Sequence, residues 1–228
     1  GTAAFDSLVD IYSTENPPAG GHYSSKTTMY HVEGQYDHSF TRVDLTVGAS
    51  FRNTNPVSNG TVFRDTGDVK INYYEIGGYA QGIWNVVDDK LKIFGSVRAD
   101  KNENYDLQLS PRLAFVYNVN ANHILRLTGQ SAFRSPTATD MYQYLNKGYG
   151  FTIGNIDGYS GGYSASSVGA AQAAGDAGLL EVQFVEAVKP EQLKSIELGY
   201  YGLISKKLVV DLSVYYNMYS DFITYAIV

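Results

Sequence analysis

The residues that could do chemistry in this chain are few, and they are not grouped as catalytic or metal sites are. Residues 100–106, "DKNENYD", place oxygen ligands at alternate positions, like the start of a calcium loop. The glycine at the sixth position and the distal glutamate of such a loop are missing, so a solvated hairpin is the better interpretation. The four histidines, His22, His31, His38 and His123, show no metal-ligand spacing. The sequence therefore predicts no metal site.

The sequence also contains no motif that indicates covalent or acid–base catalysis. Cysteine is absent, which excludes disulfides, thiolate zinc sites and cysteine nucleophiles. No Gly-x-Ser-x-Gly elbow places a Ser/His/Asp set, and no pair of carboxylates can be assigned to glycoside hydrolysis. The net charge of −6 argues against a nucleic-acid partner, which would favour a basic patch. We therefore expect a protein that is not an enzyme and that has no catalytic residues and no cofactor.

A tyrosine-rich segment, residues 135–191, is the strongest candidate for recognition. It interleaves glycine and serine with six aromatic residues: Tyr142, Tyr144, Tyr149, Phe151, Tyr159 and Tyr163. Aromatic side chains on an adaptable backbone are typical of binding loops, and segments of this length are usually functional or disordered. A surface loop without a binding role is the open alternative. The alanines of residues 168–184 could form a helical turn or two.

The rest of the chain is predicted to form β-strands, and these would position the candidate residues. Apolar and polar side chains alternate along it with a period of two, which is the pattern of a strand. In residues 41–52, every second position from Val43 to Phe51 is apolar. The same alternation predicts eight strands, at residues 28–38, 41–52, 71–86, 90–100, 105–118, 123–134, 193–204 and 207–220. Most have ten residues or more, whereas globular strands average about five or six, and a tilted strand needs about nine to eleven to cross a bilayer.

The connections between these strands are alternately short and long. The longest, about residues 53–70 and 135–191, fall on the same end of the predicted sheet. Outer-membrane barrels have short periplasmic turns and long extracellular loops, so we expect both segments to be extracellular. A soluble β-sandwich would also alternate along its strands, but it has no reason to keep this order of connections. No apolar run is long enough for a membrane-spanning helix, and no leader pattern follows Gly1.

Four segments in order resemble the barrel of TonB-dependent outer-membrane receptors. "SPRLAFVYNVNANHILRLTGQSAFRSPTATDMY" is similar to the family's Pro-Arg-Leu strand, turn and strand ending in Phe-Arg-x-Pro. "GGYAQGIWNVVDDKLKIFGSVRAD" precedes it, and "VKPEQLKSIELGYYG" and "DLSVYYNMYSDFI" follow it, over about residues 73–223. The resemblance implies an all-β, antiparallel, up-and-down transmembrane β-barrel. Residues 1–228 would form one section of about eight strands from the family's barrel of 22. Nothing in them resembles the family's plug domain or the box that engages TonB.

The resemblance also implies a function. The whole protein would lie in the bacterial outer membrane, in contact with the lipid bilayer, and would capture a scarce nutrient and import it with energy from the TonB complex acting through the plug. The ligand could be an iron chelate or corrinoid, a glycan or a peptide, and a surface lipoprotein could be a further partner. A passive porin-like barrel and a secreted soluble β-rich binding module or hydrolase remain alternatives.

Three arginines on the polar faces of the strands, Arg112, Arg126 and Arg134, are predicted to face the lumen. Arg134 could reach a carboxylate of the plug or of a neighbouring strand. For all three, a structural ion pair at the rim competes with contact to a ligand. Pro136 cannot donate to a ladder of hydrogen bonds, so we expect strand pairing to end there, at the outer rim.

Overall fold

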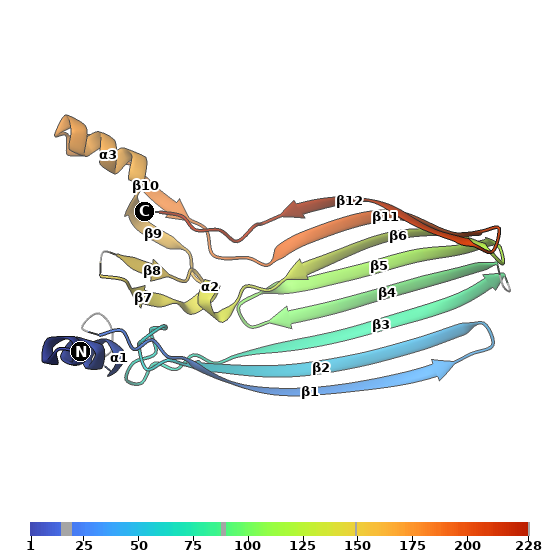
Figure 1. Ribbon diagram of the computed structural model, residues 1–228, viewed down its shortest axis with the longest axis horizontal. Coiled ribbons are helices and arrows are strands. Elements are labelled where there is room, and N and C mark those ends of the chain that lie inside the picture. Colours follow the sequence, from blue (N-terminus) through green and yellow to red (C-terminus); the bar gives the residue numbers. More distant parts are fainter. Residues whose placement is uncertain (15–19, 88–89, 149, 228) are drawn as a thin grey trace.

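The computed structural model describes residues 1–14, 20–87, 90–148 and 150–227, and its main feature is one eight-stranded antiparallel sheet (Figure 1). Its neighbouring strands follow the order of the chain: β1 (Lys26–Ser39), β2 (Val43–Val57), β3 (Tyr73–Val87), β4 (Leu91–Asn102), β5 (Tyr105–Asn120), β6 (His123–Arg134), β11 (Glu191–Ile204) and β12 (Leu208–Ser220). The predicted up-and-down arrangement is confirmed. The sheet stays open, with β1 and β12 at its edges.

The strand boundaries agree with the predicted ones to within two residues, with one difference. Strand β2 continues to Val57, five residues beyond the predicted end at residue 52. The added residues, 53–57, read Asn-Thr-Asn-Pro-Val and carry no apolar alternation. They are held because β1 is long enough to pair with them, from Tyr30 opposite Asn53 to Lys26 opposite Val57. Pairing with a neighbour, not local pattern, extends this strand.

Two rows of paired residues show that the faces of the sheet differ. One row crosses seven strands and is wholly apolar: Val43, Trp84, Ile93, Phe115, Leu127, Leu198 and Val214. A second row crosses all eight strands on the other face and is wholly polar: Asp37, Thr46, Gln81, Ser96, Arg112, Gln130, Ser195 and Asn217. The alternation seen along each strand therefore holds across the sheet as well.

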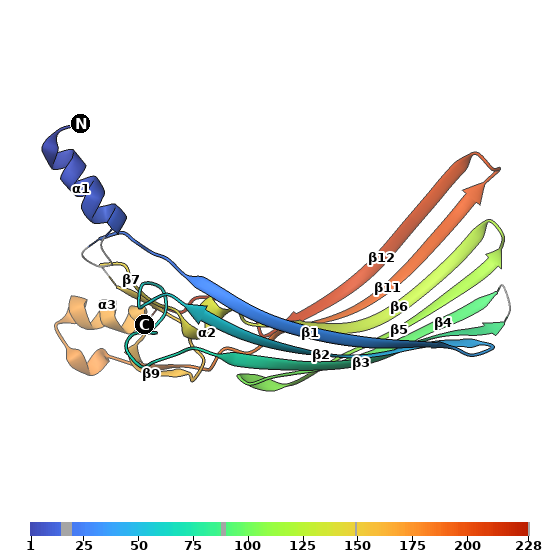
Figure 2. The ribbon, with the colours of Figure 1, turned by 90° about the horizontal axis from the view of Figure 1, so that it is seen from below.

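The apolar face is not covered by any other part of the described chain. Figure 2 shows one curved layer of strands, and the helices lie beyond its end. Leu198 and Val214, from the apolar row, remain 57% and 74% exposed. A soluble sandwich would bury this face against a second sheet, so the soluble alternative does not fit. A wall of a transmembrane barrel, apolar toward lipid and polar toward its interior, does fit.

The two ends of the sheet are built differently (Figure 1). One end has four tight connections between consecutive strands, such as the turn after Ile204, where Ser205 and Lys206 adopt positive φ. The other end carries all the remaining elements: α1 (Ala3–Thr14), α2 (Ala138–Tyr142), β7 (Tyr144–Asn146), β8 (Phe151–Ile153), β9 (Tyr159–Tyr163), α3 (Ala165–Ala174), a 3-10 turn η1 (Ala177–Leu179) and β10 (Val182–Val185). We call these elements and their connections the loop layer. Within the described residues, no helix is both long and apolar enough to cross a membrane.

Candidate functional site

The longest segment of the loop layer begins where β6 ends, and its first residues fix the direction of the chain. Pairing with β11 stops at Arg134, two residues before Pro136. The Thr137 hydroxyl then accepts a hydrogen bond from the Asp140 amide at 3.2 Å, and the Asp140 carboxylate accepts one from the Thr137 amide at 2.8 Å. This reciprocal capping box begins helix α2. A proline and a cap together therefore turn the strand into the loop layer.

Helix α2 is packed against the connection between β2 and β3, residues 58–72. Met141 and Phe63 are 2% and 4% exposed, and they are among the few fully buried apolar side chains of the described chain. The Tyr144 amide donates to the Val62 carbonyl at 2.8 Å, and Phe63 forms an isolated bridge with Gln143. The two long segments, which lie far apart in the sequence, are therefore one folded unit.

A carboxylate holds the β2–β3 connection in shape. Asp65 accepts hydrogen bonds from the Ser58 amide (2.5 Å) and hydroxyl (2.6 Å), and from the amides of Asn59 (3.0 Å) and Gly60 (2.7 Å). Asn59 and Gly60 both have positive φ, 53° and 81°, as a tight Asn-Gly turn requires. Burial raises the pKa of the Asp65 carboxyl, but these hydrogen bonds outweigh burial and lower the pKa below its ordinary 3.8. We call this arrangement the Asp65 clamp.

Three of the aromatic residues expected to bind ligand lie around α2. Tyr142 stacks on Tyr73 with ring centroids 5.9 Å apart, and burial raises the pKa of its phenol. Tyr144 contacts Phe151 at 5.1 Å, and the Arg64 guanidinium lies 5.3 Å from the centre of the Tyr144 ring. We call Arg64, Tyr144 and Phe151 the aromatic–arginine group. Such a group can stack on a planar ligand and attract negative charge.

The other expected aromatic residues are placed elsewhere. Tyr159 and Tyr163 are the ends of β9, which pairs with β10, and no ring contact in the described part of the chain joins them to the aromatic–arginine group. Tyr149 lies outside the described residues. The helical turns expected from the alanines are present as the ten-residue helix α3, which follows β9. Ser164 caps its start, and Gly175, with a positive φ of 66°, caps its end. The five of these aromatic residues that the structure describes therefore do not form a single cluster.

The three predicted lumen arginines all lie on the polar face of the sheet, and each has a protein partner. Arg134 donates to the two carboxylate oxygens of Glu191 on β11, at 2.6 and 2.7 Å. Arg112 lies over the Phe94 ring, 5.5 Å from its centre. That these side chains face a lumen stays a prediction, since the sheet is open.

Arg126 reaches further, across β11 to Asp211 on β12, at 2.8 Å. Gly199 lies between them on β11, and a Cβ there would come within 3.1 Å of the Arg126 Nε. A larger residue at position 199 would clash with the Arg126 side chain, so the glycine allows that side chain to extend across β11. The pair thereby ties three strands together.

A polar network below the loop layer was missed by sequence reasoning. Arg98 binds Asp100 through two hydrogen bonds, at 2.6 and 2.8 Å, and Asp100 is only 3% exposed. The Tyr105 hydroxyl contacts Glu75 at 3.1 Å and Ser135 at 2.7 Å. The hairpin predicted at residues 100–106 is present, but Asp100 is enclosed, so its expected solvation was wrong there. Burial of a carboxylate requires a charged partner, and Arg98 provides it. In the described ranges, no group of three or more His, Asp or Glu side chains is placed to hold a metal ion.

These features define a class of protein: the wall of a membrane β-barrel that carries a folded loop layer at one end. The sequence matches the family model "TonB dependent receptor-like, beta-barrel" over residues 2–228, and the chain belongs to this family. Proteins of this family are transporters of the outer membrane of Gram-negative bacteria, not enzymes. The predicted resemblance is thereby confirmed. No curated protein sequence matches the chain.

Solved structures show the same fold at low sequence identity. The siderophore receptor PirA of Pseudomonas aeruginosa is 16% identical, is matched over 86% of this chain and 32% of its own, and gives a TM-score of 0.62. A variant of the ferric enterobactin receptor PfeA of Pseudomonas aeruginosa is 15% identical over 90% of this chain and 28% of its own, with a TM-score of 0.63. The copper transporter OprC is 12% identical, is matched over 87% of this chain and 30% of its own, and gives a TM-score of 0.54. The chain therefore spans about three tenths of the length of these proteins.

Proposed function

We propose that this chain is part of an outer-membrane receptor that captures a metal chelate at its loop layer and imports it with energy from TonB. The observation that carries the proposal is the sheet with one apolar and one polar row, joined to a folded loop layer at one end only. A passive pore needs a two-faced wall, but it does not need a recognition layer of this size. The plug through which TonB would act lies outside this sequence.

The proposed orientation follows from the two ends of the sheet. Barrels of this kind have short turns on the periplasmic side and long loops outside the cell. The loop layer, including residues 58–72 and 135–190, would therefore be extracellular and would meet the ligand first. The polar face, with Arg112, Arg126 and Arg134, would line the lumen around the plug.

A metal chelate is preferred over a glycan or a peptide for two reasons. The structural neighbours are named as receptors for a siderophore or ferric enterobactin, or as a copper transporter. In this chain, the aromatic–arginine group offers an exposed cation beside two aromatic rings, and flat, anionic, metal-chelating groups suit that combination. Tyr142 would support the group by fixing α2, and Tyr159 and Tyr163 would supply a second contact area.

The test is uptake of the chelated metal, supplied as radioactive iron or radioactive copper, by cells that lack their own siderophore receptors and express the complete receptor. Ferric enterobactin, a ferric hydroxamate and a copper chelate are offered in turn, with and without TonB. Uptake of one chelate that disappears without TonB supports the proposal. Equal uptake in both strains would identify a passive pore, and uptake of none of the three chelates would reject the proposed ligand class.

A further inference from the structure

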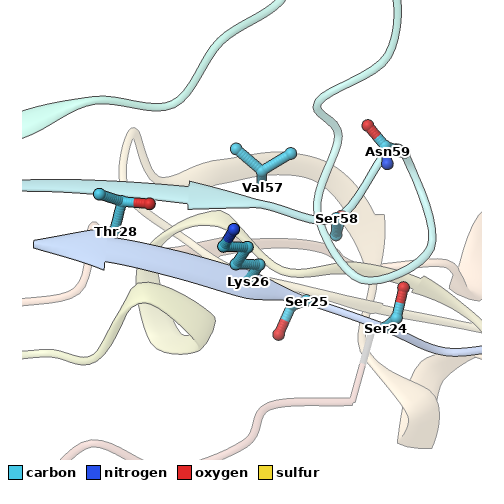
Figure 3. Close-up of a pocket in the computed structure, with 7 residues that line it drawn as sticks. All are labelled: Ser24, Ser25, Lys26, Thr28, Val57, Ser58 and Asn59. Atoms are coloured by element: carbon cyan, nitrogen blue, oxygen red, sulfur yellow. The ribbon is translucent and has the colours of Figure 1, made fainter.

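A hollow of about 400 Å³ lies where β1 begins and β2 ends, and it is not part of the aromatic–arginine group. Figure 3 shows the residues that line it. They are mostly hydroxyl-bearing and include one cation: Ser24, Ser25, Lys26, Thr28, Val57, Ser58 and Asn59. Hydroxyl and amide groups around a lysine can bind an oxygen-rich anion. The face of the sheet on which the hollow opens decides what can reach it.

The hollow opens on the apolar face. Side chains alternate along β1, so Lys26, Thr28 and Tyr30 share a face with Val32, and Lys26 is paired with Val57. Figure 3 shows Lys26 and Thr28 projecting to the same side of β1, whereas Ser25 projects to the other side. The apolar residues of β1 and β2 continue this face toward the opposite end of the sheet. The hollow is thus on the lipid side of the wall.

Its level relative to the bilayer follows from the rows below it. Val32, Phe51 and Ile76 form an apolar row, and the next row toward the loop layer contains Tyr30 and Tyr74. Tyrosines of outer-membrane barrels form girdles at the membrane interface. Lys26 is four residues beyond Tyr30, which is about 14 Å along the strand and about 10 Å along the membrane normal at the usual tilt. The hollow therefore lies at the level of the lipid headgroups or just above it.

The walls of the hollow are held in place before any ligand arrives. The Ser24 amide donates to the Thr61 hydroxyl at 3.1 Å, and that hydroxyl donates to the Ser24 carbonyl at 2.7 Å. The Asp65 clamp fixes Ser58 and Asn59, and it engages the Ser58 hydroxyl, so that hydroxyl is not free for a ligand. Preformed sites lose less entropy on binding.

Lys26 supplies the charge that the other lining residues lack. The structure shows no ion pair for Lys26 within the described residues. The nearby Asp65 carboxylate already accepts four hydrogen bonds from its own loop. The Lys26 ammonium, with the hydroxyl-bearing Ser24 and Thr28 lining the same hollow, is therefore the available donor group on this part of the lipid face.

We propose that this hollow binds the phosphorylated sugar headgroup of an outer-leaflet glycolipid, with the Lys26 ammonium on the phosphate and the hydroxyls of Ser24 and Thr28 on the sugar or phosphate oxygens. The inference rests on the outer-membrane location in the proposed function. It concerns the lipid side of the wall, not the ligand that is transported. The headgroup would anchor the start of β1 and brace the loop layer against the membrane surface.

The test uses the complete receptor, purified in detergent, and lipid A as the probe. Binding of diphosphorylated lipid A is measured by native mass spectrometry for the unchanged protein, Lys26→Gln and Lys26→Arg, with Lys70→Gln as a matched control because Lys70 is exposed in the same layer but does not line the hollow. We expect Lys26→Gln to weaken binding about tenfold, as loss of one charged hydrogen bond predicts. Lys26→Arg and Lys70→Gln should bind as the unchanged protein does. Heat-dependent mobility on a gel verifies that each variant is folded.

Three outcomes would overturn the inference. Equal binding by Lys26→Gln and the unchanged protein would show that Lys26 is not involved. Equal binding of dephosphorylated lipid A would show that phosphate is not recognised. Competition by inorganic phosphate at the same concentration as the lipid would identify a general anion site. Uptake of the metal chelate should be unchanged in Lys26→Gln, so failure of this inference can be told apart from failure of the proposed function.

Discussion

The sheet and the loop layer use apolar side chains in opposite ways. In the sheet, large apolar residues such as Leu198 and Val214 are more than half exposed, and Ala114 is the one buried apolar residue away from the loop end among the residues that the structure describes. The loop layer and the strand ends beneath it hold the others: Phe63, Ile71, Tyr105, Met141 and Ala171. The sheet relies on backbone pairing and on lipid, whereas the loop layer has a small core of its own, like a soluble domain. The sheet and the loop layer are thus suited to different surroundings, lipid and water. Substitutions in the two regions should therefore affect stability differently.

The largest effect is expected from a charge on the apolar face. Leu198→Arg would place a guanidinium at mid-strand between Leu127 and Val214, and an arginine near the bilayer midplane costs about 2–4 kcal/mol. Ser195→Arg on the polar row is the control and should cost under about 1 kcal/mol. The free energy of unfolding is measured for the complete barrel in lipid vesicles with urea. Equal effects of the two variants would refute the assignment of the faces.

A cavity in the loop layer should act locally. Met141→Ala removes a fully buried side chain, and we expect a loss of about 2–3 kcal/mol within this layer. Hydrogen exchange should rise in residues 58–72 and 135–148 but not in β4 or β11. Met141→Leu conserves volume and should restore protection. If exchange rises throughout the sheet, the loop layer is not an independent unit.

The Asp65 clamp makes the loop layer sensitive to acid. Because the folded pKa of Asp65 is lowered, its contribution to stability is complete above the unfolded pKa and is lost as the pH falls through the folded pKa, below 3.8. Protection of the Ser58, Asn59 and Gly60 amides should therefore persist down to that range and then fall. Asp65→Asn should reduce protection even at neutral pH, by about 1–2 kcal/mol. If the protection of these amides depends on pH in the same way in Asp65→Asn and in the unchanged protein, the Asp65 clamp is not the cause of the acid sensitivity.

The smallest effect should distinguish the two groups of loop aromatics. Arg64→Ala and Tyr144→Ala should each weaken binding of the transported chelate about fivefold, whereas Tyr144→Phe keeps the ring and should bind normally. Tyr163→Ala, on β9, is the comparison and should change affinity less than twofold. Affinity is measured with the complete receptor by fluorescence quenching. A larger loss from Tyr163→Ala would move the proposed recognition site to β9 and β10.

The sheet could be predicted from the sequence because each strand carries its own signal. Alternation from Val43 to Phe51 needs no knowledge of the neighbouring strand. The end of β2 was missed because residues 53–57 carry no alternation of their own and are held by pairing, residues 53 and 54 with both β1 and β3 and residues 55–57 with β1. Alternation also cannot tell a solvated polar residue from an enclosed one, so the burial of Asp100 by Arg98 was not foreseen.

The candidate site could be predicted only in part, for a different reason. Composition located the aromatic residues between β6 and β11, but their grouping depends on contacts between distant segments. Phe63 with Gln143, and Arg64 with Tyr144, join two connections that lie far apart in the sequence. No local period records such contacts. The Asn-Gly pair at Asn59 is a local signal for a turn, but it does not reveal the Asp65 carboxylate that holds the turn.

The ion pair that passes over Gly199 has a consequence for assembly. Arg126 on β6 and Asp211 on β12 meet only when both strands are in their native alignment with β11. A slip of β12 by one residue would carry the Asp211 carboxylate to the bilayer side, away from Arg126, at a high cost. Misaligned intermediates therefore lack this ion pair while the barrel is being inserted, and the native alignment is favoured over them. Gly199 makes this possible, because it leaves room for the Arg126 side chain to cross β11 and reach β12.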